Sequence, residues 1–335
     1  MKAAIITAFG APEVLEVRDV PLPSPATDEV LIRVYATAVN RADLLQREGK
    51  YPPPPGVPQD IPGMEFAGEV VGNGASAKRW RPGDRVFGII GGGSYAEYVV
   101  ANEATLAEVP ANLSWTEAAS IPEVFLTAHD ALWTQAGLRT GENVLIHAVG
   151  SGVGIAALQL VRAKGAVPFG TSRTRDKLEA VREFGLEEGL HLPGPEIESA
   201  LKVFSKRVTG GRGFDVVLDL VGGPYVQGSI SALAQKARVL LVGTVGGAKV
   251  ELNLGQVLGK RAHLIGTVLR ARPLEEKIAV AKAFARDVVP LLTAGKLRTS
   301  IDREFPFTTE GVRAAHERVG SNQSIGKVVI RFDHS

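Results

Sequence analysis

A glycine-rich turn between an apolar strand-like run and an apolar helix constrains this chain more than any other feature. Residues 144–146 form a short β-type run, the turn occupies residues 150–154, and residues 155–164 are apolar at helical spacing. Gly165 ends this predicted helix, and residues 166–172 form a second strand-like run. Such a βαβ unit of about thirty residues is the context that a dinucleotide-binding fingerprint requires.

The turn suits a pyrophosphate because glycine lets the backbone come close, and the following helix presents free N–H groups with partial positive charge. A strict G-x-G-x-x-G pattern starting at Gly150 would need glycine where Ile155 stands. The close-packing glycine is instead Gly154, one residue early. The surrounding strand, helix and strand still indicate a dinucleotide site.

The end of the second strand bears on which dinucleotide binds. A chain that binds NAD usually places Asp or Glu about twenty residues after the turn, where it holds the ribose 2′-hydroxyl. Here the first acid is Asp176, which lies within the start of the next helix. The polar residues Ser172, Arg173 and Lys177 suit a 2′-phosphate, and the alternative is a solvated helix start. We therefore predict NADPH as the cofactor.

Composition excludes several classes of protein. A chain of 335 residues with 45% hydrophobic residues is expected to form two domains. The net charge of +2, without a basic block, makes nucleic acid an unexpected partner. Without cysteine there is no disulfide or thiolate metal site, and the six histidines show no ligand spacing. The short apolar start and the lack of a membrane-length apolar run predict a cytoplasmic protein.

The first part of the chain has a strand-rich pattern. Short alternating runs separated by Pro and Gly, as in an antiparallel barrel-like domain, lie at residues 3–5, 29–35, 65–71 and 85–90. A short helix over residues 40–49 interrupts them, followed by four prolines at residues 52–55.

After about residue 122 the pattern alternates between strands and helices. A helix is expected over residues 124–135, and strands are expected over residues 214–221, 237–243 and 263–269. This alternation predicts an α/β fold with a parallel, doubly wound sheet. A helix over residues 274–294 and a last strand over residues 325–332 follow, and that strand is able to pair back with the N-terminal domain.

Several motifs along nearly the whole chain make it resemble a known family. The chain is similar to the zinc-independent quinone oxidoreductases, the zeta-crystallin-like branch of the medium-chain dehydrogenases/reductases. The motifs that carry this resemblance are residues 38–43 (AVNRAD), 63–68 (GMEFAG), 81–86 (RPGDRV), 93–98 (GSYAEY), 141–154 and 324–327 (SIGK).

The resemblance implies a GroES-like catalytic domain, split in sequence, with an inserted Rossmann-type NADPH-binding domain. We place the first part of the catalytic domain at residues 1–122, the inserted domain at 123–265 and the return at 266–335. It also implies a homodimer or homotetramer. Zinc-dependent relatives carry Cys near the position of Asn40 and Gly-His-Glu in place of Gly63–Met64–Glu65. Without those ligands, no metal is expected.

The resemblance further implies a set of cofactor-binding residues. The pyrophosphate would be held by Gly150, Ser151, Gly152 and Val153, and the 2′-phosphate by Ser172, Arg173 and Lys177. The nicotinamide would be lined by Val242, Gly243, Thr244, Thr267 and Leu269. Further contacts with the cofactor would come from Tyr51, Asn322 and Lys327. The chain departs from the family at two positions. A tyrosine that assists the 2′-phosphate aligns with His191–Leu192, and an arginine with the same role falls near Asn322.

The function predicted from the resemblance is metal-free transfer of a hydride from NADPH to a quinone. Water, Tyr51 or Asn40 supplies the proton, although Asn40 is equally suited to be a helix N-cap. One alternative is NADPH-dependent reduction of the C=C bond of enals or enones. A non-enzymatic alternative is an NADPH-binding structural or RNA-binding protein, which the low net charge disfavours.

Overall fold

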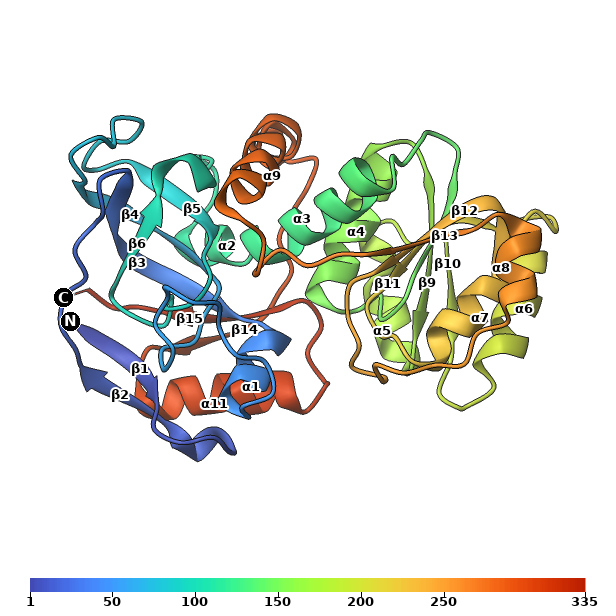
Figure 1. The fold of residues 1–335 in the computed structure, drawn as a ribbon, viewed down its shortest axis with the longest axis horizontal. Coiled ribbons are helices and arrows are strands. Elements are labelled where there is room, and N and C mark those ends of the chain that lie inside the picture. Colours follow the sequence, from blue (N-terminus) through green and yellow to red (C-terminus); the bar gives the residue numbers. More distant parts are fainter. Residues whose placement is uncertain (335) are drawn as a thin grey trace. The chain divides into compact units, whose positions relative to one another are not determined.

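The computed structural model describes residues 1–334, which form two compact units (Figure 1). We call Met1–Leu126, together with the segment that starts at Leu269, the split unit. Thr127–Val268 form the inserted unit. The domain boundaries predicted from the sequence, at 122/123 and 265/266, lie a few residues from these limits.

The inserted unit contains a six-stranded sheet in which every neighbouring pair is parallel. Its strands, in spatial order, are β10 (Glu188–His191), β9 (Val167–Ser172), β8 (Asn143–Ile146), β11 (Phe214–Asp219), β12 (Leu233–Leu241) and β13 (His263–Gly266). This is the 3-2-1-4-5-6 order of a Rossmann-type domain, so the predicted fold class is confirmed. The order reverses between β8 and β11, where such sheets bind their ligands.

Helices lie on both faces of this sheet (Figure 1). They are α4 (Gly152–Ala163), α5 (Arg175–Ala180), α6 (Ile197–Val208), α7 (Pro224–Ala232) and α8 (Leu254–Lys260), with a short 3₁₀ helix, η4 (Arg182–Phe184). The aromatic side chains of Phe169 on β9, Phe204 on α6 and Phe214 on β11 pack together in the core. Burial of both faces explains why the strands read as nearly continuous apolar runs.

The split unit contains a seven-stranded, mostly antiparallel sheet. Its strands are β14 (Ile301–Pro306), β15 (Lys327–Arg331), β3 (Glu29–Val39), β4 (Glu65–Asn73), β5 (Arg85–Ile89) and β7 (Leu106–Glu108), with β6 (Tyr98–Asn102) on β3. A separate hairpin joins β1 (Lys2–Ile6) and β2 (Leu15–Asp19). The C-terminal β15 pairs with the N-terminal β3, as predicted for the last strand.

The other helices of the described residues range from short turns to α9, which has 14 residues. They are α1 (Arg41–Arg47), α2 (Trp115–Ala119), α3 (Pro122–His129), α9 (Leu274–Asp287), α10 (Val289–Thr293) and α11 (Thr309–Gly320), with 3₁₀ helices η1 (Pro12–Val14) and η2 (Glu103–Thr105).

Two predicted helices differ from the observed elements. The helix expected over residues 124–135 is α3 followed by a π-helix, η3 (Asp130–Gln135). The helix expected over residues 274–294 is interrupted at Val288, because Pro290 has no N–H to continue the hydrogen-bond pattern and its ring favours a new helix start.

Candidate cofactor site and polar site

The glycine-rich turn has the geometry of an anion-binding helix start. Ser151 is the N-cap of α4, and its Oγ accepts a hydrogen bond of 3.1 Å from the Gly154 N–H. Gly152 and Val153 are the first two helical residues, so their N–H groups have no partner within the helix. A Cβ at Gly154 would lie 2.6 Å from the Val149 carbonyl oxygen, so only glycine fits there. The early third glycine therefore does the close packing expected of it.

The side chain of Lys177 lies across the same turn. A Cβ built on Gly150 would lie 3.0 Å from Lys177 Cβ and 3.1 Å from its Cδ, so the lysine stem runs over the glycine. Ser172, the last residue of β9, is buried and its Oγ accepts a 3.2 Å hydrogen bond from the Thr174 N–H. Arg173 is exposed next to it. The structure thus brings the predicted 2′-phosphate residues next to the predicted pyrophosphate turn.

His191 lies beside Ser172, where the resemblance implied a tyrosine. The two residues are paired in register between β10 and β9, so their side chains share one face of the sheet. The His191 Nε2 lies 3.0 Å from the Arg173 carbonyl oxygen. No carboxylate ends β9, which is the feature that separates this strand from an NAD-type strand.

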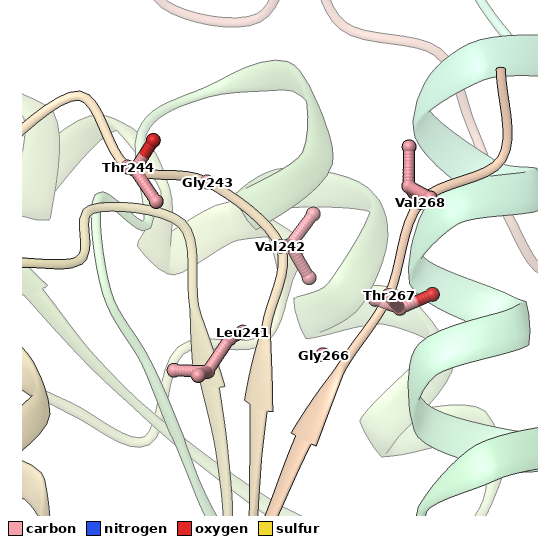
Figure 2. Close-up of a pocket in the computed structure, with 7 residues that line it drawn as sticks. All are labelled: Leu241, Val242, Gly243, Thr244, Gly266, Thr267 and Val268. Atoms are coloured by element: carbon pink, nitrogen blue, oxygen red, sulfur yellow. The ribbon is translucent and has the colours of Figure 1, made fainter. Parts of the chain in front are cut away.

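Four of the five predicted nicotinamide residues line one pocket of about 300 Å³ (Figure 2). The pocket lies at the carboxyl ends of the neighbouring strands β12 and β13, and its lining residues are Leu241, Val242, Gly243, Thr244, Gly266, Thr267 and Val268. The Thr267 Oγ1 accepts a 2.6 Å hydrogen bond from Gln135 Nε2. Leu269 is buried and is not among the lining residues.

Two buried titratable residues at this edge of the sheet were not predicted. His147 follows β8, and its ring lies between Thr171 Oγ1 at 2.9 Å and Ser229 Oγ at 2.8 Å. Burial lowers the pKa of His147 to about 4, so the ring is neutral at pH 7. Asp219 ends β11, and its Oδ1 accepts two backbone N–H bonds of 2.8 Å. Its Oδ2 is buried and has no hydrogen-bond partner in the part of the chain that the structure describes.

The split unit holds a buried ion pair, Lys327–Glu65, in contact with Asn40. The Lys327 Nζ lies 2.7 Å from Glu65 Oε1, 2.7 Å from Asn40 Oδ1 and 3.1 Å from the Val39 carbonyl oxygen. The side chains of Lys327 and Glu65 are only 6% and 0% exposed. An ammonium group therefore lies between Asn40 and Glu65. The predicted contact of Lys327 with the cofactor stays a prediction.

Asn40 lies at the start of α1 and forms its hydrogen bonds within the split unit. It is the N-cap residue of α1, and its N–H donates to Asp43 Oδ2 at 2.8 Å. Its side-chain Nδ2 donates to Glu65 Oε1 at 2.8 Å and to the Ala38 carbonyl oxygen at 3.3 Å. Both amide hydrogens are thus used inside the unit, which leaves Asn40 poorly placed as a proton donor.

Asp43 ends a directed chain of buried hydrogen bonds, which we call the Asp43 network. Arg47 can only donate, so His316 Nδ1 accepts at 3.3 Å and its Nε2 carries the proton. That Nε2 donates to the Tyr95 hydroxyl at 3.2 Å, and Tyr95 donates to Asp43 Oδ2 at 3.4 Å. Burial raises the pKa of Asp43 to about 6, opposed by hydrogen bonds from the Asn40 and Gly63 N–H groups. Asp43 thereby connects the start of α1 to Gly63 and Tyr95.

Tyr51 and Asn322, predicted to contact the cofactor, lie in the split unit. Tyr51 is half-buried, and burial raises the pKa of its hydroxyl. The guanidinium of Arg270, which was not among the predicted site residues, lies 5.1 Å from the centre of the Tyr51 ring. The Asn322 Oδ1 accepts a 2.6 Å hydrogen bond from Arg41. The roles of Tyr51 and Asn322 toward the cofactor stay predictions.

Two kinds of feature are absent from the described residues. Residues 1–334 contain no group of three or more His, Cys, Asp or Glu side chains arranged to hold a metal ion. Nor does any helix in this part of the chain have the length and apolar character needed to cross a membrane. The cytoplasmic location expected from the sequence stays a prediction.

Comparison with known families agrees with this architecture. The family model described as "Alcohol dehydrogenase GroES-like domain" matches residues 26–111, and the model described as "Zinc-binding dehydrogenase" matches residues 152–286. The fold and these two matches define a medium-chain dehydrogenase/reductase.

Similarity to individual proteins identifies the family within this superfamily. The quinone oxidoreductase of Homo sapiens is 32% identical over 335 residues, covering 98% of this chain and 97% of that protein. The Pseudomonas aeruginosa quinone oxidoreductase is 31% identical, with coverages of 96% and 97%. The structure of Escherichia coli quinone oxidoreductase complexed with NADPH matches with a TM-score of 0.86 and 26% identity, covering 99% and 100% of the chains. This chain belongs to the zinc-independent quinone oxidoreductases of that superfamily, which confirms the resemblance seen in its motifs.

Proposed function

We propose that this protein transfers a hydride from NADPH to a quinone without a metal ion. The observation that carries the proposal is the position of Lys177 across the glycine turn, beside a strand that ends in Ser172 and not in an acid. The full-length similarity to quinone oxidoreductases, one of them solved with NADPH, supports the same activity.

The residues of the inserted unit fit NADPH. The N–H groups at Gly152 and Val153 would bind the pyrophosphate, because they lack helical partners and lie at a helix N-terminus. Ser172 and Lys177 would bind the 2′-phosphate, Lys177 through a charge-assisted contact. The pocket at the ends of β12 and β13 would receive the nicotinamide against Val242. When bound, the cofactor supplies the hydride.

The split unit fits a substrate that needs no metal. A quinone is already electrophilic, and the oxygen of its reduced form is weakly basic, so it needs neither a Lewis acid nor a strong proton donor. Asn40 has both amide hydrogens engaged, and we propose that it shapes the site without transferring a proton. We propose that Tyr51 orients the cofactor, since the raised pKa of its hydroxyl keeps it protonated and able to donate.

Steady-state kinetics with NADPH and a matched panel of quinones and 2-enals tests this function. We expect quinones to be reduced with a higher kcat/KM than enals of similar size. Reduction of enals alone would overturn the quinone assignment and leave the C=C reductase alternative in place. Lack of turnover with either class, while NADPH still binds, would support a binding protein.

We also propose that the protein is a homodimer that pairs through β13. This strand is the outer edge of the inserted sheet, where unpaired backbone groups offer a partner strand. Apolar side chains are exposed on and beside it, among them Leu264 on β13 and Leu254 and Leu258 on α8, the last with 76% exposure. Such a cluster marks an interface in many proteins.

Light scattering of a variant tests the dimer. Leu258→Glu should yield monomers at concentrations where the parent is dimeric. The control is Val203→Glu on α6, which is also exposed and apolar but lies away from the β13 edge. A monomeric parent, or a dimer unchanged by Leu258→Glu, contradicts this arrangement.

A further inference from the structure

Arg270 is a buried cation that no part of the predicted site explains. It lies two residues after Val268, at the start of the C-terminal part of the split unit, and is 7% exposed. Arginine is almost never buried unless it is paired. Among the described residues, Arg270 forms no ion pair with a carboxylate: Asp43 and Glu123 raise its pKa through space, while burial lowers it by a larger amount.

Two of its three nitrogens are anchored to neutral oxygen atoms. Nε donates to the Gly91 carbonyl oxygen at 2.7 Å, and Nη2 donates to Gln46 Oε1 at 2.6 Å. Gln46 is itself buried and donates its Nε2 to the Gln59 carbonyl oxygen at 3.2 Å. The Gln59 side chain in turn ties down the proline-rich segment through the Pro54 carbonyl oxygen, at 3.2 Å. The guanidinium is therefore held in place while keeping its charge.

The third nitrogen, Nη1, is buried and has no hydrogen-bond partner within residues 1–334. A buried donor left unsatisfied costs roughly 1–3 kcal/mol, and more when it is charged. Such a group gains most when an anionic oxygen reaches it, since charge-assisted hydrogen bonds are about twice as strong as neutral ones. The fixed, unsatisfied donor of Arg270 therefore suits an anionic oxygen of a ligand.

The Tyr51 ring identifies what kind of ligand would fit. The guanidinium lies 5.1 Å from the centre of this half-buried ring, so a cation and an aromatic face are presented together. A planar ring that carries an oxygen with negative charge can use both. Quinones acquire this character when they accept a hydride.

We propose that Arg270 Nη1 and the Tyr51 ring form the binding site for the quinone oxygen that becomes negatively charged, which makes Arg270 a catalytic residue. The proposal rests on the proposed function. The quinone gains the hydride and its electron pair, NADPH is oxidised to NADP⁺, and the hydroquinone monoanion then takes one proton from water. Arg270 stabilises the anion before that proton arrives, and gives up no proton itself.

A purely structural role for Arg270 is the competing explanation. In that case it only ties Gly91 to Gln46, and its loss would lower stability without changing the affinity for anions. The two explanations differ in the charge state of a bound phenol. A cation at the oxygen lowers the pKa of a bound phenol. An Arg270 that only connects Gly91 to Gln46 leaves the pKa of the phenol at its solution value.

The probe is 4-nitrophenol, a redox-inert aromatic whose phenolate is coloured and can be titrated in the bound state. With the parent protein we expect the phenolate to bind more tightly than the phenol. Arg270→Gln should weaken phenolate binding at least about tenfold, and Arg270→Lys, which keeps the charge, should weaken it less. The control is Arg286→Gln, an exposed arginine of the same unit that pairs with Asp287.

The outcomes separate this proposal from the proposed function. Equal binding of phenolate by the parent and a folded Arg270→Gln protein overturns the role of Arg270, even if quinones are reduced. If Arg270→Gln does not fold, equal preference of the parent for phenol and phenolate overturns it too. Phenolate binding that depends on Arg270, in a protein that reduces no quinone, supports the anion site and refutes the proposed activity. For the active enzyme, kcat should fall in Arg270→Gln with the NADPH dissociation constant unchanged.

Discussion

The inserted unit and the split unit build their polar sites in opposite ways. The inserted unit uses one continuous stretch, residues 143–177, whose backbone N–H groups and one lysine stem meet at a turn. The split unit joins side chains that are far apart in the chain, such as Asn40, Glu65, Tyr95 and Lys327. The first site is mostly backbone and faces anions, whereas the second is a buried network of charges that satisfy one another.

This difference predicts different responses to substitution. A site of backbone groups fails when a glycine gains a side chain, but it keeps its fold when a charged side chain is removed. A buried network fails when one partner is lost, because the remaining charge stays buried without compensation. Removing one lysine from each unit therefore separates folding from binding.

The largest effect is expected for Lys327→Met. This substitution leaves Glu65 buried without its ammonium partner and should lower the free energy of unfolding by about 3–5 kcal/mol, measured by chemical denaturation. Adding Glu65→Gln to it should restore part of the loss. The control is Lys50→Met, whose side chain is 67% exposed beside Glu48 and which should change stability by less than about 0.5 kcal/mol. Equal effects of the two single substitutions would refute the buried ion pair.

In the inserted unit, Lys177→Met should change binding but not folding. Methionine keeps an apolar stem over Gly150 and removes only the ammonium, which is worth about 1.5–3 kcal/mol to a phosphate. We expect NADPH affinity to fall at least about tenfold and NADH affinity to stay nearly constant, as measured by titration calorimetry. The exposed Lys202→Ala on α6 serves as the control. An equal loss of affinity for both cofactors would show that Lys177 does not bind the 2′-phosphate.

The two units should also respond differently to acid. Burial lowers the pKa of His147 to about 4 and that of His316 to about 3, from 6.5, so the unfolded chain takes up these protons first. Each unit therefore loses stability as the pH falls below 6.5. In the split unit the raised pKa of Asp43, about 6 instead of 3.8, has the opposite sign, because the folded state takes up this proton first. Asp43 offsets part of the loss between pH 6 and 4.5.

Hydrogen exchange at pH 6.5, 5.5 and 4.5, corrected for intrinsic rates, measures this difference. Protection of β8 amides should decrease more than protection of α11 amides. Asp43→Asn should remove the offset and make the split unit as acid-sensitive as the inserted unit. Parallel losses in the parent protein would argue against the opposed titrations.

A smaller effect is expected for Tyr51→Phe. If the hydroxyl orients the cofactor, its loss removes one neutral hydrogen bond, worth about 0.5–1.5 kcal/mol, and mainly weakens NADPH binding. The ring that faces Arg270 is kept. Kinetics at saturating NADPH with a simple quinone give the answer. A fall in kcat of roughly a hundredfold, with an unchanged NADPH dissociation constant, would make Tyr51 the proton donor.

The site built from one continuous stretch was more predictable from the sequence than the site built from distant residues. The turn, the role of Gly154 and the set around Ser172 and Lys177 were predictable, because strand, turn and helix follow one another within thirty-five residues. The pairing of Glu65 with Lys327 was not, since it depends on β15 and β4 both pairing with β3. One signal was present: each residue is the first of its strand, and the two side chains carry opposite charges.

Arg270 carried no comparable signal. In the sequence it belongs to an arginine-rich segment before α9, and this composition predicts a solvent-exposed loop. Its burial depends on Gly91 and Gln46, which come from two other segments. The interruption at Val288, in contrast, was predictable from Pro290 alone.

The most direct test of the account is the rate of quinone reduction with NADPH and with NADH, each measured with and without a metal chelator. The lack of a carboxylate at the end of β9 and the position of Lys177 predict at least about a tenfold higher kcat/KM for NADPH. The ammonium of Lys327 between Asn40 and Glu65 predicts that the chelator changes neither rate. A preference for NADH, or activity lost to the chelator and restored by zinc, would contradict the account.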